Sequence, residues 1–204
     1  LGMATLNQIF RQSHRFNTIG VRHFSKAFSC TPQPQILSRD MGKNQWYVHM
    51  SRTGDSADLG LIKSTIQRLR KDCDAEGINL VLGFGPSLLK DLTSDLPSDF
   101  QDYPSPGYES KDGSGKVAKG TQEELLIWVN HDDKDKIWKA QYDARMALEN
   151  HMKVARETPT FIYGDSLDLT GFIDGTGNPE PATRDKDVAI VPDGQSGAGG
   201  SFII

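Results

Sequence analysis

Residues 165–181, DSLDLTGFIDGTGNPEP, surround the carboxylate of Asp174 with glycines and end near a proline. Glycine has no Cβ, so it admits positive φ angles and close backbone approaches that other residues exclude. The run is compatible with a turn in which Asp174 caps the backbone and the glycines supply positive φ. It is also suited to bringing backbone and a carboxylate against a large, flat ligand. The residues alone leave both interpretations open.

Other stretches that could do chemistry lack necessary parts. GFGPSL at 83–88 lacks the third glycine of a dinucleotide-binding loop, and DGSGKV at 112–117 lacks the first glycine and the final Ser or Thr of a P-loop. His49, His131 and His151 are not spaced as metal ligands. We therefore predict neither a phosphate loop nor a metal site from these residues.

The composition is that of a soluble globular protein, with 36% hydrophobic and 25% charged residues among 204. No apolar run approaches the roughly 18 residues of a membrane-spanning helix, so we expect no membrane partner. Cys30 and Cys73 are the only cysteines, which is too few for a disulfide framework. Trp46, Trp128 and Trp138 are predicted to be core or sheet-face aromatics.

Charge is distributed unevenly along the chain. Residues 1–39 hold five basic and no acidic residues, which leaves a net charge of −9 for residues 40–204. An acidic body argues against a nucleic-acid partner, because phosphate contacts need clustered Lys and Arg. The basic, acid-free segment 1–39 is typical of a mitochondrial targeting peptide, and RHFS at 22–25 resembles a matrix-protease cleavage pattern. The alternative is a disordered basic tail on a cytoplasmic protein.

Periodicity predicts an ordered series of elements after the basic segment. Alternating or continuous apolar runs predict strands, and apolar residues at helical spacing predict helices, the first of them with Asp55 or Ser56 as N-cap. The stretch 92–120, rich in Pro, Gly and Ser, predicts a long loop. The predicted strands are 45–50, 78–84, 124–130 and 160–163, and the predicted helices are 56–71 and 133–151.

The order strand, helix, strand, strand, helix, strand predicts an α+β fold, the ferredoxin-like βαββαβ arrangement with both helices on one face of an antiparallel sheet. The other face must then be covered by a second half, a partner or a cofactor. VAIVP at 188–192 and GGSFII at 199–204 are interpreted as strands that begin a second half. The expected organisation is a targeting or disordered segment at 1–39 and a first half at 40–163. Residues 164–204 are expected to hold the glycine-rich motif loop and the incomplete start of a second half.

Over most of residues 44–204, the sequence resembles the dye-decolourising peroxidases, a family of haem enzymes. DLTGFIDGTGNP at 168–179 closely resembles the family's motif. LVLGFGPSL at 80–88, GTQEELLIWVN at 120–130 and the stretch 188–204 are similar to segments on either side of it. The resemblance implies paired ferredoxin-like halves with haem b between sheet and helices, and it implies hydrogen peroxide and a small organic electron donor as substrates.

The resemblance also implies roles for single residues. Asp174 matches the distal aspartate, which moves the peroxide proton during cleavage of the O–O bond, a task for general acid–base catalysis. The iron-ligating histidine and the distal arginine of the family match no position here, because both are expected beyond Ile204. The residues implied to face the haem are Gly171, Phe172, Ile173, Gly175, Thr176 and Asn178.

Two hypotheses of function follow. The first is a haem peroxidase represented by a truncated sequence, a reading that also fits a chain beginning with Leu1 rather than Met. The second is a truncated, non-catalytic ferredoxin-like module for binding or dimerisation, which lacks an iron ligand and uses its sheet face for another partner. In both cases, the open sheet face predicts a homo-oligomer.

Overall fold

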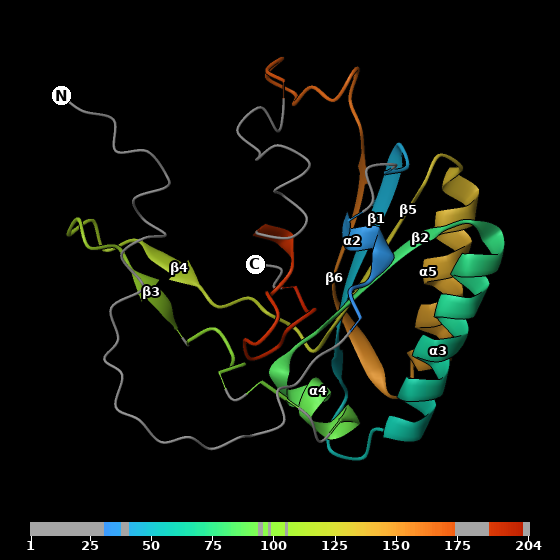
Figure 1. The fold of residues 1–204 in the computed structure, drawn as a ribbon, viewed down its shortest axis with the longest axis horizontal. Helices are drawn as coiled ribbons and strands as arrows, with labels where there is room; N and C mark the ends of the chain where they lie inside the picture. The colour runs from blue at the N-terminus through green and yellow to red at the C-terminus, as the bar shows by residue number, and fades with distance from the viewer. Residues whose placement is uncertain are drawn as a thin grey trace.

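The computed structural model describes residues 31–37, 41–93, 96–97, 99–104, 106–173 and 188–201. Its centre is an antiparallel sheet of four strands in the order β2-β5-β1-β6, shown in Figure 1. By position along the chain, these are the second, third, first and fourth strands of the sheet, which is the ferredoxin-like order. The α+β prediction is thus confirmed. The four strands are β1 (Asn44–Arg52), β2 (Asn79–Phe84), β5 (Leu125–His131) and β6 (Met152–Phe161).

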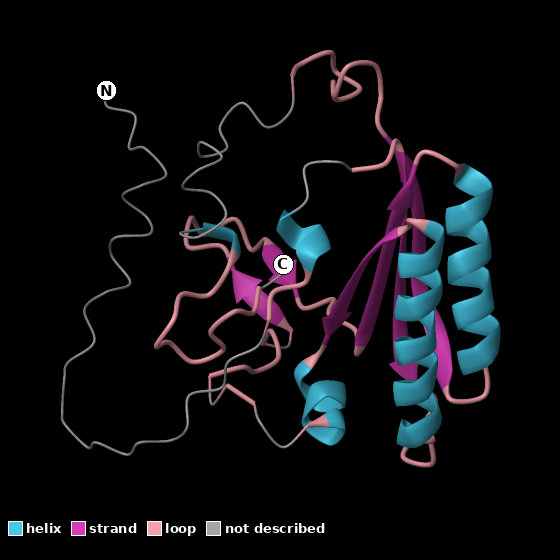
Figure 2. Cartoon of the chain, turned by 45° about the vertical axis from the view of Figure 1, so that its right-hand side comes forward, coloured by secondary structure: helices cyan, strands magenta, loops and turns pink. Residues whose placement is uncertain are grey.

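Two long helices, α3 (Leu59–Glu76) and α5 (Lys134–Leu148), cover one face of the sheet, as Figure 2 shows. The side chain of Asp58 accepts the Leu61 N–H at 3.0 Å, and that of Asp133 accepts the Asp135 N–H at 2.9 Å. These carboxylates satisfy backbone donors that have no partner within the first turn. The prediction that Asp55 or Ser56 caps the first helix is wrong, because Asp58 does so.

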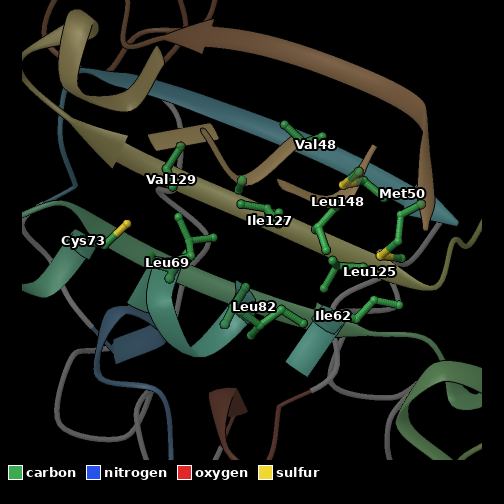
Figure 3. Packing of buried hydrophobic residues seen from close by; sticks show 14 of the residues in the cluster. Val48, Met50, Ile62, Leu69, Cys73, Leu82, Leu125, Ile127, Val129 and Leu148 are labelled. Atoms are coloured by element: carbon green, nitrogen blue, oxygen red, sulfur yellow. The ribbon is translucent and has the colours of Figure 1, made fainter. Parts of the chain in front are cut away.

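The core lies between this face and the two helices (Figure 3). Strands and helices both contribute aliphatic side chains at the periodicities that the sequence predicted. Each large aliphatic side chain stabilises the fold by about 1.5–3 kcal/mol when fully buried. The labelled members with almost no exposed surface are Val48, Met50, Ile62, Leu125, Ile127, Val129 and Leu148. Trp46 packs against this core, whereas Trp138 is 47% exposed, so the prediction that Trp138 is a core or sheet-face aromatic is wrong.

Strand β6 is longer than the sequence predicts, and it begins eight residues before the predicted strand at 160–163. The preceding helix correspondingly ends at Leu148, and the prediction that it continues to residue 151 is wrong. β6 lies at the edge of the sheet and exposes residues such as Lys153 and Thr158, so it lacks the apolar pattern of a central strand. Its register comes from pairing with β1, a tertiary contact that local propensity does not contain.

The predicted loop at 92–120 contains a small hairpin of β3 (Gly107–Glu109) and β4 (Val117–Lys119). It follows the short helix α4 (Pro86–Leu92), which begins after Gly85. A Cβ on Gly85 would lie 2.6 Å from the carbonyl oxygen of Glu123, so the glycine of GFGPSL permits a close backbone approach.

The segment 188–201 is a compact loop, and the strand predicted at 188–192 is not formed there. Val191 donates its N–H to the Gly200 carbonyl at 2.8 Å, and its own carbonyl accepts the Gly199 N–H at 3.0 Å. The segment therefore satisfies part of its backbone internally rather than by joining the sheet.

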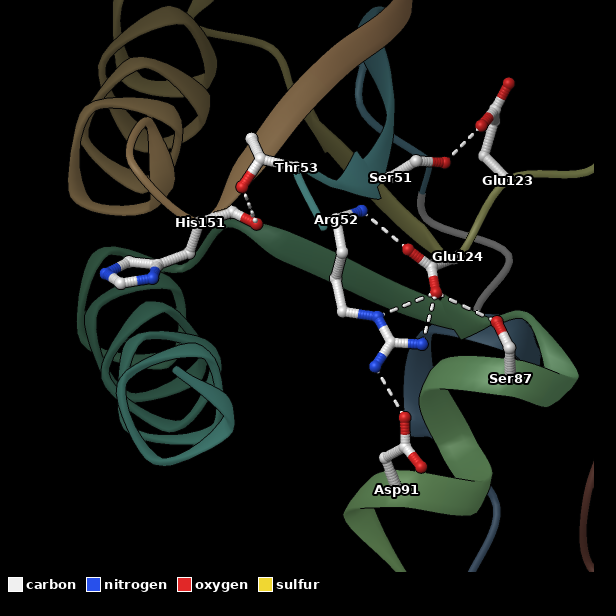
Figure 4. A network of polar contacts seen from close by, with 8 residues as sticks. All are labelled: Ser51, Arg52, Thr53, Ser87, Asp91, Glu123, Glu124 and His151. Atoms are coloured by element: carbon white, nitrogen blue, oxygen red, sulfur yellow. Dashed lines mark hydrogen bonds and ion pairs between the residues drawn. The ribbon is translucent and has the colours of Figure 1, made fainter. Parts of the chain in front are cut away.

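A polar clamp joins β1, α4 and the residue preceding β5 (Figure 4). The guanidinium of Arg52 lies 2.6 Å from a carboxylate oxygen of Glu124 and 2.5 Å from one of Asp91. Ser87, in the first turn of α4, donates its hydroxyl to Glu124 at 2.9 Å. Burial alone would raise the pKa of Glu124, but hydrogen bonds from Arg52 and Ser87 outweigh burial and hold that pKa below its usual value of 4.5.

The outer edge of β2 is closed by a glutamine side chain. Gln33 donates its amide to the Leu82 carbonyl at 2.7 Å and accepts the Leu82 N–H at 2.9 Å. Arg70 of α3 donates to the same amide oxygen at 2.7 Å. Gln33 and the following turn α2 (Pro34–Leu37) belong to the segment 1–39, of which residues 1–30 and 38–39 lie outside the described residues.

We expect Glu124→Gln to lower the free energy of unfolding at neutral pH by about 2 kcal/mol, because hydrogen bonds to a charged group are lost. The folded-state pKa is depressed, so the stabilisation is complete above pH 4.5 and is lost as pH falls through the lower, folded-state pKa. The difference from wild type should therefore vanish on acidification, which urea unfolding at several pH values measures. Glu76→Gln is the control, because its ion pair with Lys136 is exposed. If the two variants lost the same free energy of unfolding, Glu124 would not stabilise the fold more than an exposed ion pair does.

We expect Gln33→Ala to cost about 1 kcal/mol of stability and to speed hydrogen exchange at the Leu82 amide, because that N–H loses its acceptor. Gln35→Ala is a matched control two residues away, since the Gln35 side-chain oxygen has no hydrogen-bond partner in the described part of the chain. Unchanged exchange at Leu82 in Gln33→Ala would show that the glutamine does not close this edge.

Candidate functional site

The motif begins on a turn that follows directly from β6. The chain leaves the sheet at Phe161, and Leu167 forms isolated bridges to both Tyr163 and Ile173. The Leu167 N–H donates to the Tyr163 carbonyl at 3.0 Å. In Figure 1 this orange segment extends beyond the end of the sheet. The edge strand β6 therefore carries the start of the motif away from the helical layer.

Asp168 organises this turn. Its carboxylate accepts the N–H of Thr170 at 2.8 Å and that of Phe172 at 3.4 Å, and it also accepts the Thr170 hydroxyl. These hydrogen bonds, with those of Thr170 the strongest, lower the pKa of Asp168 below its usual value. Sequence reasoning concentrated on Asp174 and missed Asp168. The signal was available in the Asp-Leu-Thr order, since Asp commonly bonds the backbone two residues on.

Gly171 is required for the geometry of the turn. Its φ is +91°, which residues with a side chain rarely adopt, and a Cβ there would have no atom within 4 Å. The next two residues, Phe172 and Ile173, are 74% and 65% exposed, and Leu169 is also exposed. Contiguous exposed apolar side chains of this size mark a surface that binds something.

Three of the predicted haem-facing residues, Gly171, Phe172 and Ile173, are thus consecutive on an open turn. The predicted distal acid Asp174 follows directly in the sequence. Asp174, Gly175, Thr176 and Asn178 lie outside the described residues, so their roles stay predictions.

The sheet face opposite the helices carries an aromatic pair. Tyr47 and Trp128 stack with ring centroids 5.2 Å apart, and Gln45 accepts hydrogen bonds from both at 2.9 and 3.0 Å. Burial raises the pKa of Tyr47. His49 lies on the same face, and its pKa is lowered by burial and by the positive charge of Arg156, with Glu123 opposing them.

The other two histidines of the sequence analysis serve as backbone acceptors. His131 accepts the Asp133 N–H at 2.8 Å, and His151 accepts the Asp58 N–H at 3.0 Å, so both stabilise helix starts. Among the described residues, no group of three or more His, Cys, Asp or Glu side chains could hold a metal ion. No helix within those residues combines the length and apolarity needed to cross a membrane.

Comparison with known proteins connects this turn to a family. Residues 165–204 match the family described as Dyp-type peroxidase, C-terminal. The match begins where the turn after β6 begins and includes all the predicted site residues.

Solved structures of similar fold cover the larger part of the chain. DyPB from Rhodococcus jostii RHA1 is 21% identical with a TM-score of 0.66, and the match covers 81% of this chain and 53% of that chain. The dye-decolorizing protein from V. cholerae is 22% identical with a TM-score of 0.63, over 80% of this chain and 55% of that chain. A DypB variant from Rhodococcus jostii RHA1, solved in complex with heme, is 22% identical with a TM-score of 0.63, over 75% and 50%.

These likenesses show the fold, and this chain spans about half the length of the structures that it matches. The fold of the described residues and the family match at 165–204 point to the same group of proteins. Residues 165–204 thus match the Dyp-type peroxidase family, and the described residues have the fold of structures from that family.

Proposed function

We propose that this chain supplies the distal side of a haem b peroxidase, which reduces hydrogen peroxide and oxidises small organic donors. The observation that carries the proposal is the open turn at 165–173, which exposes Phe172 and Ile173 immediately before Asp174. The family match at residues 165–204 supports peroxidase chemistry, and a structure of similar fold was solved in complex with heme. Because the chain spans about half the length of the structures that it matches, the activity is proposed for the whole protein.

The described residues fit a haem group. A porphyrin has two broad apolar faces. The exposed apolar side chains of the turn would be shielded from water by contact with such a face. Gly171 has open space where a Cβ would be, so backbone and ligand can approach closely there. The residues that would lie along the haem are Gly171, Phe172 and Ile173, followed by the predicted Gly175, Thr176 and Asn178.

When bound, haem supplies the iron centre that passes electrons from donors to peroxide. The chain's contribution is to exclude water and to move a proton. We propose that the Asp174 carboxylate accepts the proton from one peroxide oxygen and returns it to the departing oxygen, so that one water leaves. Over the cycle, hydrogen peroxide takes two electrons and two protons and gives two waters, with one electron from each of two donor molecules.

Asp168 has a positioning role in this proposal. Its carboxylate holds Thr170 and Phe172 by their N–H groups and thereby fixes the turn that presents the next residues. The partly buried sheet face around Tyr47 and Trp128 lies on the side away from the two long helices, where the second half of a longer protein would complete the site.

In the protein expressed from the full coding sequence, we expect Asp174→Asn to lower the rate of peroxide consumption by about 10²–10⁴-fold, because the amide cannot accept the proton. Haem binding should persist, as measured by the Soret band during haemin titration. Asp165→Asn is the matched control, since it removes the same charge at an exposed position nine residues earlier in the chain and should retain the wild-type rate.

An Asp174→Asn protein with wild-type peroxide turnover would rule out the proposed role. A wild-type protein that binds no haem would exclude the peroxidase function itself. In that case, the non-catalytic binding module would account for the exposed turn.

A further inference from the structure

The N-terminal segment 1–39 contains two parts that differ in composition. Residues 1–30 hold four basic residues and no acid, which is typical of a targeting peptide. Residues 31–37, TPQPQIL, carry no charge and place Gln33 between two prolines. This second part belongs to the described structure and lies against the edge of the sheet. The segment is therefore a targeting peptide, or a basic tail, only in its first part.

Gln33 is fixed to the outer edge of β2 by three hydrogen bonds. Its side-chain amide pairs with both backbone groups of Leu82, at 2.7 and 2.9 Å, and Arg70 donates to the same amide oxygen at 2.7 Å. The prolines that follow Thr31 and Gln33 favour an extended backbone at both residues, and Pro34 is suited to the first position of a helix. Gln33 therefore loses little backbone freedom when it binds the edge.

The outer edge of β2 depends on this segment for its cover. β2 is an outer strand of the sheet, and α2 lies beside it in Figure 1. An uncovered outer strand presents unpaired N–H and C=O groups to solvent and to other chains. A chain that had lost residues 31–37 would expose the backbone of Leu82. Proteolysis that preserves this edge must therefore end before Gln33.

The sequence places a cleavage pattern upstream of Gln33. In RHFS, Arg22 is the third residue before the bond between Phe24 and Ser25, which is the spacing of the matrix-protease pattern. Gln33 lies eight residues beyond Ser25, and an extended chain of that length reaches at most about 29 Å. A protease can thus bind residues on both sides of this bond without detaching Gln33 from β2.

We propose that the Phe24–Ser25 bond is a processing site for a mitochondrial matrix protease that recognises Arg22. The retained residues then close the edge of β2 through Gln33. Water adds across the peptide bond, so that Phe24 gains a carboxylate and Ser25 gains a free amino group. The cut removes three arginines and no acid, which changes the formal net charge from −4 to −7. The proposal does not depend on haem or on peroxidase activity.

The first test is incubation of the full chain with purified mitochondrial matrix-processing protease, followed by mass spectrometry of the products. We expect one large product that begins at Ser25. Arg22→Gln should slow its formation by at least about tenfold, because the hydrogen bonds of a charged group to the protease are lost. The matched control is Arg15→Gln, which removes the same charge seven residues upstream and should leave the rate of cleavage unchanged.

The stability of the processed chain tests where the fold begins. The product that starts at Ser25 should unfold in urea at the same concentration as the full chain and keep slow hydrogen exchange at the Leu82 amide. Gln33→Ala should be cut at the same bond, but its product should show faster exchange at Leu82. Its unfolding equilibrium constant should rise roughly fivefold, because the edge has lost its partner.

A chain that the protease leaves intact, or cuts at a different bond, would overturn the processing site, and residues 1–30 would then be a basic tail. A cut beyond Gln33 would overturn the retention of the edge cover. A correctly cut product that is less stable than the full chain would also contradict the proposal, because residues before Ser25 would then belong to the folded unit.

Discussion

The central constraint on this structure is the pairing of β1 along both of its edges. β5 and β6 each form an antiparallel ladder with β1, and these ladders hold together segments more than 70 residues apart in the sequence. Because side chains alternate along β1, Val48 and Met50 enter the core while Tyr47 and His49 lie on the other face. The same pairing fixes where β6 ends and so where the glycine-rich motif leaves the sheet. A single strand therefore links the hydrophobic core to the position of the candidate site.

Most of the sheet and of its two covering helices could be predicted from the sequence, because these elements follow simple periodicities. β5 has alternating buried residues, and α5 has Ile137, Ala144 and Leu148 at helical spacing, so local pattern and tertiary packing agree. The length of β6 was underestimated because an edge strand with polar residues has little hydrophobic pattern of its own. Gln33 was not predicted as a strand partner, because a single side chain that satisfies both backbone groups of Leu82 has no sequence period.

The site was predictable in a different way. The order of residues in DLTGFIDGTGNP pointed to a family, and residues 165–204 match that family. The turn interpretation of the motif expected its glycines to supply positive φ, and Gly171 has a φ of +91°. It did not identify Asp168, whose carboxylate holds the turn through local hydrogen bonds. A carboxylate such as Asp174 can be recognised from its neighbours in the sequence. The residues that position it, such as Asp168, are recognised only once the hydrogen bonds of the turn are known.

The central claim is that the open turn before Asp174 meets haem. The most direct measurement is hydrogen exchange across residues 165–178 in the protein from the full coding sequence, with and without haemin, alongside titration of the Soret band. The account predicts that haem binds and slows exchange in the segment containing Gly171, Phe172 and Ile173, while the hairpin of β3 and β4 exchanges as before. Haem binding that leaves exchange at 165–178 unchanged would contradict the claim, because the apolar turn would then face something else.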